Sequence, residues 1–151
     1  MNKYMQLAFE DALKGIAANA GGPFGACVVK DGKILSVAHN EVLASQDPTA
    51  HAEIVAIRRA AKAIGSHDLS GAEIYATGYP CPMCLSAIIW ANIKTCYYSN
   101  SLKEAEKIGF RDDLIYHYLG GKETGVEIIA MDEGDCLSLY DQYQAANKTI
   151  Y

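Results

Sequence analysis

The stretch EIYATGYPCPMCLSAIIWANIKTCYY, residues 73–98, decides the fold. Residues 73–77 and 93–98 have the β-branched and aromatic character of strands, and residues 82–90 form an apolar segment of helical length. The two cysteines of this stretch, Cys81 and Cys84, fall where that helix begins. The stretch therefore predicts a strand, a helix and a second strand, with two thiols at the start of the helix.

Hydrophobic spacing predicts the elements on either side of this stretch. Asp31-Gly32 suits a tight hairpin turn between two strands, and Asp47-Pro48 suits the start of a helix. We expect helices over 2–19, 49–63, 101–108 and 135–147, strands over 25–29, 33–37 and 126–131, a loop over 40–46 and a partly helical segment over 109–121. A hairpin followed by alternating helices and strands implies an α/β fold, a three-layer α/β/α sandwich around a mixed sheet of about five strands.

Composition indicates the class of protein. A chain of 151 residues, half of them hydrophobic, fits a single domain over residues 1–151. Its net charge of -5 argues against nucleic acid as a partner and favours a small, uncharged substrate. Five cysteines without a disulfide spacing indicate a reducing compartment, and neither a secretory signal nor a membrane-length apolar run is visible. We therefore expect a cytoplasmic protein with no membrane partner.

Two short motifs supply metal-binding chemistry. His51-Ala52-Glu53 and Pro80-Cys81-Pro82-Met83-Cys84 provide one imidazole, two thiols and one further carboxylate. Three protein ligands, His51, Cys81 and Cys84, leave a position open for water, as in catalytic zinc sites. His-x-Glu followed by Pro-Cys-x-x-Cys is typical of zinc deaminases, in which the Glu moves protons and does not bind the metal. The motifs therefore predict a Zn²⁺ cofactor and Glu53 as the catalytic acid and base.

The spacing of these residues supports separate roles. Cys81 and Cys84 are three residues apart at a helix start, so they share a face, and the helix dipole favours their thiolate forms. A soft ligand set of this kind suits zinc. Residues two apart on a helix point to different sides, so His51 and Glu53 are not expected to bind the metal together.

Three other interpretations of the motifs remain. A closed structural zinc site would need a fourth ligand such as His39 or Cys136. A thioredoxin-like redox pair would leave His51 and Glu53 without a role. A non-catalytic zinc-binding module would keep the metal and the fold but show no turnover.

Longer blocks around the motifs carry a family resemblance. Residues 21–26, 47–53 and 80–88 resemble the cytidine deaminase-like superfamily over nearly the whole chain. Residues 109–116 and the terminal Tyr151 resemble its bacterial guanine deaminase branch. The resemblance implies zinc-dependent hydrolytic deamination of an aminated purine, with guanine converted to xanthine and ammonia.

The resemblance also implies an assembly and a set of substrate contacts. It implies a homodimer in which the C-terminal segment crosses to the partner and helps to close its active site. The implied substrate-binding residues form the walls, the hydrogen-bonding groups and the cover of the pocket, and they are Phe24, Asn40, Trp90, Asp112 and Tyr151. The neighbouring Asp113 is an alternative to Asp112.

The chain departs from the family pattern at Gly78-Tyr79, where many relatives carry a small residue or Cys followed by Glu. An aromatic ring beside the metal ligands bears on substrate choice, so guanosine, ammeline-like triazines and cytosine stay open as substrates. tRNA adenosine deaminases share both motifs, but the net charge and the lack of a basic C-terminal end count against an RNA substrate.

Overall fold

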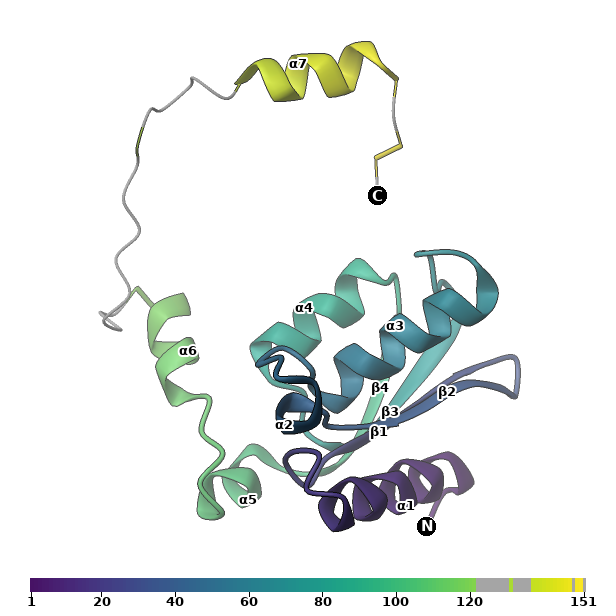
Figure 1. Cartoon of the computed structure of the whole chain (residues 1–151), viewed down its shortest axis with the longest axis vertical. Coiled ribbons are helices and arrows are strands. Elements are labelled where there is room, and N and C mark those ends of the chain that lie inside the picture. Colours follow the sequence, from purple (N-terminus) through teal and green to yellow (C-terminus); the bar gives the residue numbers. More distant parts are fainter. Residues whose placement is uncertain (122–130, 132–136, 148, 151) are drawn as a thin grey trace.

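The sheet of this protein is mixed and lies between two layers of helices (Figure 1). The computed structural model describes residues 1–121, 131, 137–147 and 149–150. Within these residues the layers follow the order helix, sheet, helix, which confirms the predicted α/β/α sandwich.

Four strands form the sheet in the described part of the chain, in the order β2-β1-β3-β4. Strand β1 runs antiparallel to both β2 and β3, whereas β3 and β4 are parallel. The fifth strand expected over 126–131 lies, except for Met131, outside the described residues. The strand bounds are Gly25–Lys30 (β1), Lys33–His39 (β2), Ala72–Gly78 (β3) and Thr95–Asn100 (β4).

The hairpin between β1 and β2 turns at Asp31 and Gly32, as the sequence predicts. Their φ angles are 50° and 74°. Two successive positive φ angles give a turn whose twist matches that of the two strands.

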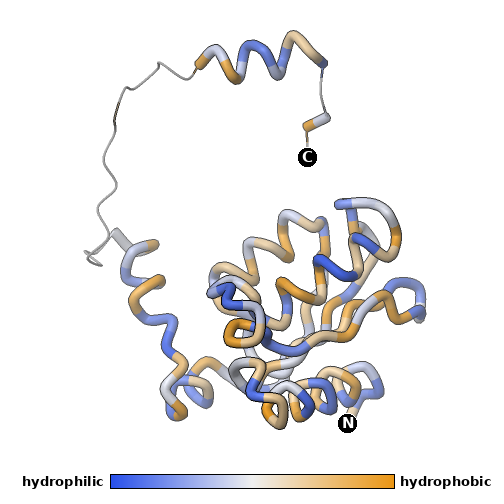
Figure 2. The backbone as a smooth tube through the Cα atoms, viewed as in Figure 1, coloured by the Kyte–Doolittle hydropathy of each residue, from blue (hydrophilic) through white to orange (hydrophobic). Residues whose placement is uncertain are grey.

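Helices cover both faces of the sheet, and the alternation of side chains along β1 explains why. Cys27 and Val29 pack with Met5 of α1 (Lys3–Ala17). Ala26 and Val28 belong to the larger core on the opposite face, which α3 (Ala52–Ile64) and α4 (Pro82–Trp90) cover. Hydrophobic residues follow the strands and the helices packed on them (Figure 2). Successive strand residues point to opposite faces, so one short strand serves two cores.

Gly25 allows α1 to lie close to the sheet. A Cβ at this position would stand 1.9 Å from the carbonyl oxygen of Ala8. Only a residue without a side chain fits there, so the approach of α1 to β1 depends on this glycine.

Two local predictions were wrong. The segment expected to be a loop over 40–46 contains a short helix, α2 (Val42–Ser45), in which the amides of Leu43 and Ala44 donate to the carbonyl of Ala20 at 2.9 Å. The helix expected from residue 49 begins at Ala52, because the carboxylate of Asp47 accepts the Thr49 amide at 2.8 Å and closes a separate turn. Helix α2 thus depends on a contact with a residue distant in sequence, and the start of α3 depends on a turn closed by a side chain.

The remaining described helices lie beyond the core: α5 (Leu102–Lys107), α6 (Asp113–Leu119) and α7 (Leu137–Ala145). Helix α7 falls within the predicted segment 135–147 and buries none of its residues. Among the described helices, none combines the length and the apolar character needed to cross a membrane.

Candidate functional site

The N-terminal ends of α3 and α4 carry the metal-binding motifs. His51 is the N-cap of α3 and Cys81 is the N-cap of α4, where the sulfur of Cys81 accepts the Cys84 amide at 3.5 Å. Pro82 occupies the first turn, where no intrahelical amide bond is lost. Free amides and the positive end of the helix dipole therefore face the two sulfurs and favour their thiolate forms.

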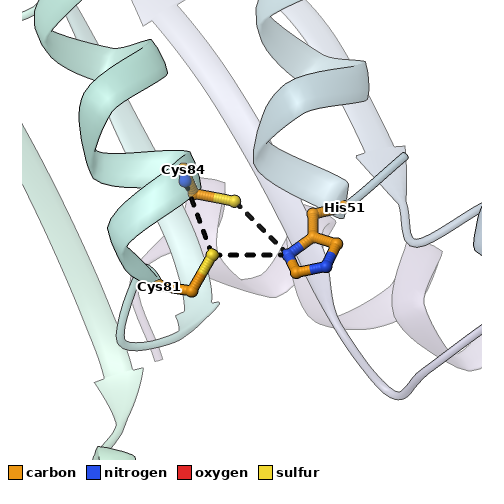
Figure 3. A group of neighbouring side chains, drawn as sticks. All are labelled: His51, Cys81 and Cys84. Carbon is orange, nitrogen blue, oxygen red and sulfur yellow. Dashed lines mark hydrogen bonds between the residues drawn. The ribbon is translucent and has the colours of Figure 1, made fainter. Parts of the chain in front are cut away.

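The three donor atoms have the spacing that a zinc ion requires. Nδ1 of His51 lies 3.6 Å from Sγ of Cys81 and 3.5 Å from Sγ of Cys84 (Figure 3). Zinc at about 2.3 Å from sulfur and about 2.05 Å from nitrogen, with tetrahedral angles, holds these atoms about 3.6 Å apart. All three donor atoms lie within 4.8 Å of one another. The cluster fits Zn²⁺ with a fourth position left for water.

The electrostatics of the two thiols also favour a cation. Hydrogen bonding from Cys84 and His51 lowers the pKa of Cys81 to about 4. The pKa of Cys84 is raised, first by its hydrogen bond to Cys81 and then by burial. One thiol thus ionises readily and opposes ionisation of the other, and a divalent ion between them compensates both charges.

Glu53 stands beside this cluster and is separate from it. Its side chain is 7% exposed and lines the cavity that adjoins His51 and Cys81. Burial raises the pKa of its carboxyl group. A carboxyl group that holds a proton more readily than usual is suited to accepting and returning protons.

A cavity of about 530 Å³ opens from the metal-binding cluster. It brings together three of the five predicted substrate residues, Phe24, Asn40 and Asp112, with His51, Cys81 and Glu53. Asp112 lines the cavity, whereas Asp113 forms an ion pair with Arg111 at 3.3 Å. Of the two neighbouring aspartates, Asp112 is therefore the one placed to meet a ligand.

Asn40 is held in one orientation. Its side-chain oxygen accepts the Val42 amide at 3.0 Å, so the amide nitrogen is the group left for a ligand. A Cβ on Gly21 would stand 2.0 Å from that oxygen, so the glycine makes room for the side chain. Asn40 is only 4% exposed and presents a fixed donor to the cavity.

The structure does not bring Trp90 to the cavity. Trp90 ends α4 and is 65% exposed, whereas the cavity adjoins Cys81 at the other end of this helix. Eight steps of about 1.5 Å put the two ends of α4 about 12 Å apart. Tyr151, the remaining predicted substrate residue, lies outside the described residues.

Sequence reasoning missed some of the apolar wall. Phe110 lines the cavity and packs edge-on against Phe24, with ring centroids 5.1 Å apart, and Ile115 lines it as well. Both residues fall in the block 109–116, so the resemblance contained a signal for them. Tyr79, noted in the sequence as a departure from the family pattern, also lines the cavity.

A closed structural zinc site would need a fourth protein ligand, and none lies in the metal-binding group among the described residues. His39 binds Asp11, with Nδ1 2.8 Å from a carboxylate oxygen, and is not part of the metal-binding group. Cys136, the other proposed fourth ligand, lies outside the described residues.

Comparison with known proteins agrees with this site. Residues 1–100 match the cytidine and deoxycytidylate deaminase zinc-binding region, and the chain belongs to this family of zinc-dependent aminohydrolases. The chain is 45% identical to guanine deaminase of Bacillus subtilis over 113 residues, which cover 75% of this chain and 72% of that protein. The X-ray structure of guanine deaminase from Bacillus subtilis matches 100% of this chain and 99% of its own, with a TM-score of 0.93 and 38% identity.

A second group of relatives is named for the deamination of adenosine in tRNA. A tRNA-specific adenosine deaminase of Aquifex aeolicus is 44% identical over 77 residues, which cover 51% of each protein. The similarity to the Aquifex protein is shorter than that to the guanine deaminase. A tRNA-specific adenosine deaminase of Haemophilus influenzae is 38% identical over 153 residues, which cover 98% of this chain and 87% of that protein.

Proposed function

We propose that this protein deaminates guanine by hydrolysis, so that guanine and water give xanthine and ammonia. The observation that carries the proposal is the cavity in which His51, Cys81 and Glu53 meet Asn40 and Asp112. The similarity of the whole chain to a guanine deaminase structure supports the choice of substrate.

The metal-binding cluster and Glu53 divide the chemistry. We propose that His51, Cys81 and Cys84 bind zinc, which when bound activates a water molecule as a nucleophile. The Glu53 carboxylate accepts a proton from the attacking water. It delivers this proton to the ring nitrogen, then accepts the remaining proton of the added hydroxyl and passes it to the amine, so that the carbon–nitrogen bond breaks, ammonia leaves and the oxo product forms.

Three side chains recognise the ring. Phe24 offers an aromatic wall, the Asn40 amide nitrogen donates to an acceptor on the purine, and the Asp112 carboxylate accepts from a ring N–H. Burial raises the pKa of Asp112, and the negative charge of Cys81 adds to this effect. A partly desolvated carboxylate of this kind gains more from a bound N–H donor than an exposed one does.

We further propose a homodimer whose C-terminal segment crosses to the partner and brings Tyr151 to the neighbouring cavity. Exposed apolar residues support such an assembly, and they are Leu85, Ile89 and Trp90 on α4, Leu114 and Leu119 on α6, and Leu137, Leu139 and Tyr140 on α7. In this proposal Trp90 belongs to the subunit contact. Sedimentation as a monomer at micromolar concentration would contradict it.

We propose a cytoplasmic location. The four cysteines within the described residues, Cys27, Cys81, Cys84 and Cys96, are free thiols, as a reducing compartment favours. Comparison of the protein in cytoplasmic and extracellular fractions tests this location.

Ammonia release tests the function. The zinc-loaded protein is assayed with guanine, guanosine, adenine, cytosine, cytidine and ammeline, with Glu53→Gln as the matched inactive variant. We expect turnover of guanine, its loss in Glu53→Gln and one zinc per chain in both. Turnover of another ring in place of guanine would refute the substrate. Salt-sensitive binding and deamination of tRNA, with no activity on free bases, would favour the function named for the Aquifex relative.

A further inference from the structure

Tyr79 has a fixed position at the edge of the cavity. It follows the last residue of β3, and its amide donates to the Asn100 carbonyl at 2.8 Å, which ties it to the end of β4. Its ring packs edge-on against Tyr98, with centroids 4.9 Å apart and planes at 76°. Both contacts hold the Tyr79 ring against the cavity wall, of which it forms part.

The hydroxyl group of Tyr79 is not held by another described residue, unlike the hydroxyls of three other tyrosines. The hydroxyls of Tyr4, Tyr75 and Tyr143 each donate to a protein oxygen, at 3.2, 3.0 and 2.6 Å. Within the part of the chain that the structure describes, the Tyr79 hydroxyl makes no hydrogen bond. A phenol beside a cavity with both its donor and its acceptor unused can bond to a ligand.

Exposure is graded along the cavity. Glu53 and Cys81, beside the metal-binding cluster, are each 7% exposed, whereas Tyr79 is 39% and Phe110 44% exposed. The cavity therefore has an inner end with the chemistry and an outer end with Tyr79. Asp112 lines the same cavity as Tyr79.

The chemistry of the substrate fixes how it must lie between these two ends. The carbon that loses its amine must stand beside Glu53 at the inner end. In guanine that carbon and the imidazole ring are at opposite ends of the molecule, so the imidazole edge, with one N–H donor and one nitrogen acceptor, points to the outer end.

We propose that Tyr79 is a specificity-determining residue whose hydroxyl hydrogen-bonds to the imidazole edge of the purine, so that the site selects bicyclic purines over monocyclic aminated rings. This inference rests on the proposed function. The contact forms equally in the bound substrate and in the transition state, because the imidazole edge takes no part in the reaction. Its loss therefore raises KM and leaves kcat unchanged.

The test pairs one change in the protein with one in the substrate. Tyr79→Phe removes only the hydroxyl, and isocytosine is guanine without its imidazole ring, with the same amino and oxo groups. We expect Tyr79→Phe to raise the KM for guanine about three- to tenfold, the effect of one neutral hydrogen bond, with kcat within twofold. Isocytosine is measured as a substrate and as a competitive inhibitor of guanine turnover. Its KM and its inhibition constant should be the same in the unmodified protein and in Tyr79→Phe.

Tyr97→Phe is the matched control, since Tyr97 lies on β4 and stacks on Tyr75 outside the cavity. The inference is overturned if Tyr79→Phe keeps the KM for guanine within twofold of that of the unmodified protein. It is also overturned if Tyr79→Phe raises the KM for isocytosine as much as the KM for guanine, or if Tyr97→Phe raises the KM for guanine equally. Absence of guanine turnover in the unmodified protein would instead refute the proposed function. Zinc content of one per chain in each variant shows that the site is intact.

Discussion

Replacement of Gly21 by alanine tests how the fold positions the substrate. The added methyl carbon would stand 2.0 Å from the side-chain oxygen of Asn40 and 2.8 Å from its carbonyl oxygen. Separations under 3.0 Å are essentially never seen for a Cβ, so the Asn40 amide must move by about 1 Å. This movement breaks the hydrogen bond that Asn40 accepts from the Val42 amide at 3.0 Å.

The size of both effects follows from that displacement. A buried amide left without its partner costs about 1–3 kcal/mol in the free energy of unfolding, which lowers Tm by about 2–12 °C in a domain of this size. The donor to the substrate is displaced by the same movement. A misplacement of about 1 Å lowers kcat/KM for guanine about ten- to hundredfold. Zinc content should not change, because the added methyl meets Asn40 and Gly21 is not part of the metal-binding cluster.

Urea unfolding, guanine kinetics and zinc analysis measure the three quantities. Gly65→Ala is the control, since a methyl there meets nothing within 4 Å and only the positive φ of 67° is strained. In an Asn40→Ala background, Gly21→Ala should cost less, because the displaced amide is gone. The reasoning is refuted if Gly21→Ala keeps the stability and the kcat/KM of the unmodified protein, or if its cost is undiminished in the Asn40→Ala background.

Three further predictions concern the metal, the substrate and the core. Cys84→Ala should lose zinc and lower the free energy of unfolding, since binding energy adds to folding energy; one zinc per chain by elemental analysis would contradict the ligand assignment. Asp112→Asn should lower kcat/KM for guanine at least tenfold, whereas Asp113→Asn should change it less than twofold; equal effects in steady-state assays would contradict the placement of these side chains. Gly25→Ala should destabilise the fold by about 3 kcal/mol or more, since the new Cβ would stand 1.9 Å from the Ala8 carbonyl oxygen, and a denaturant midpoint equal to that of the unmodified protein would exclude this.

Much of the fold and of the metal-binding cluster follows from local signals in the sequence. Helix α4 has the predicted bounds, Pro82–Trp90, because its N-terminal signals and its apolar length are contained in one segment. The place of the two cysteines at the start of this helix was predictable for the same reason. Cys81 and Cys84 are neighbours on one helical turn whatever the rest of the chain does.

What the sequence did not predict depends on contacts between distant segments. Helix α2 forms where amides of Leu43 and Ala44 meet the carbonyl of Ala20, and no local pattern announces that contact. The family resemblance implied that Trp90 lines the pocket, but the apolar helix that it ends does not show which of its ends adjoins the cavity. Periodicity defines the faces of a helix and leaves the position along its axis open.

The same arrangement explains why the site can tolerate some changes and not others. Cys81 and Cys84 pack with Ile54 of α3 in one buried cluster, so the residues that we propose as metal ligands also join α4 to α3. Their replacement is therefore expected to harm stability and catalysis together. Glu53, Asn40 and Tyr79 lie on the cavity wall and can be replaced by residues of nearly the same shape without loss of that packing. Substrate choice can thus change at the outer end of the cavity, through residues such as Tyr79, while the metal-binding core that carries the reaction stays the same.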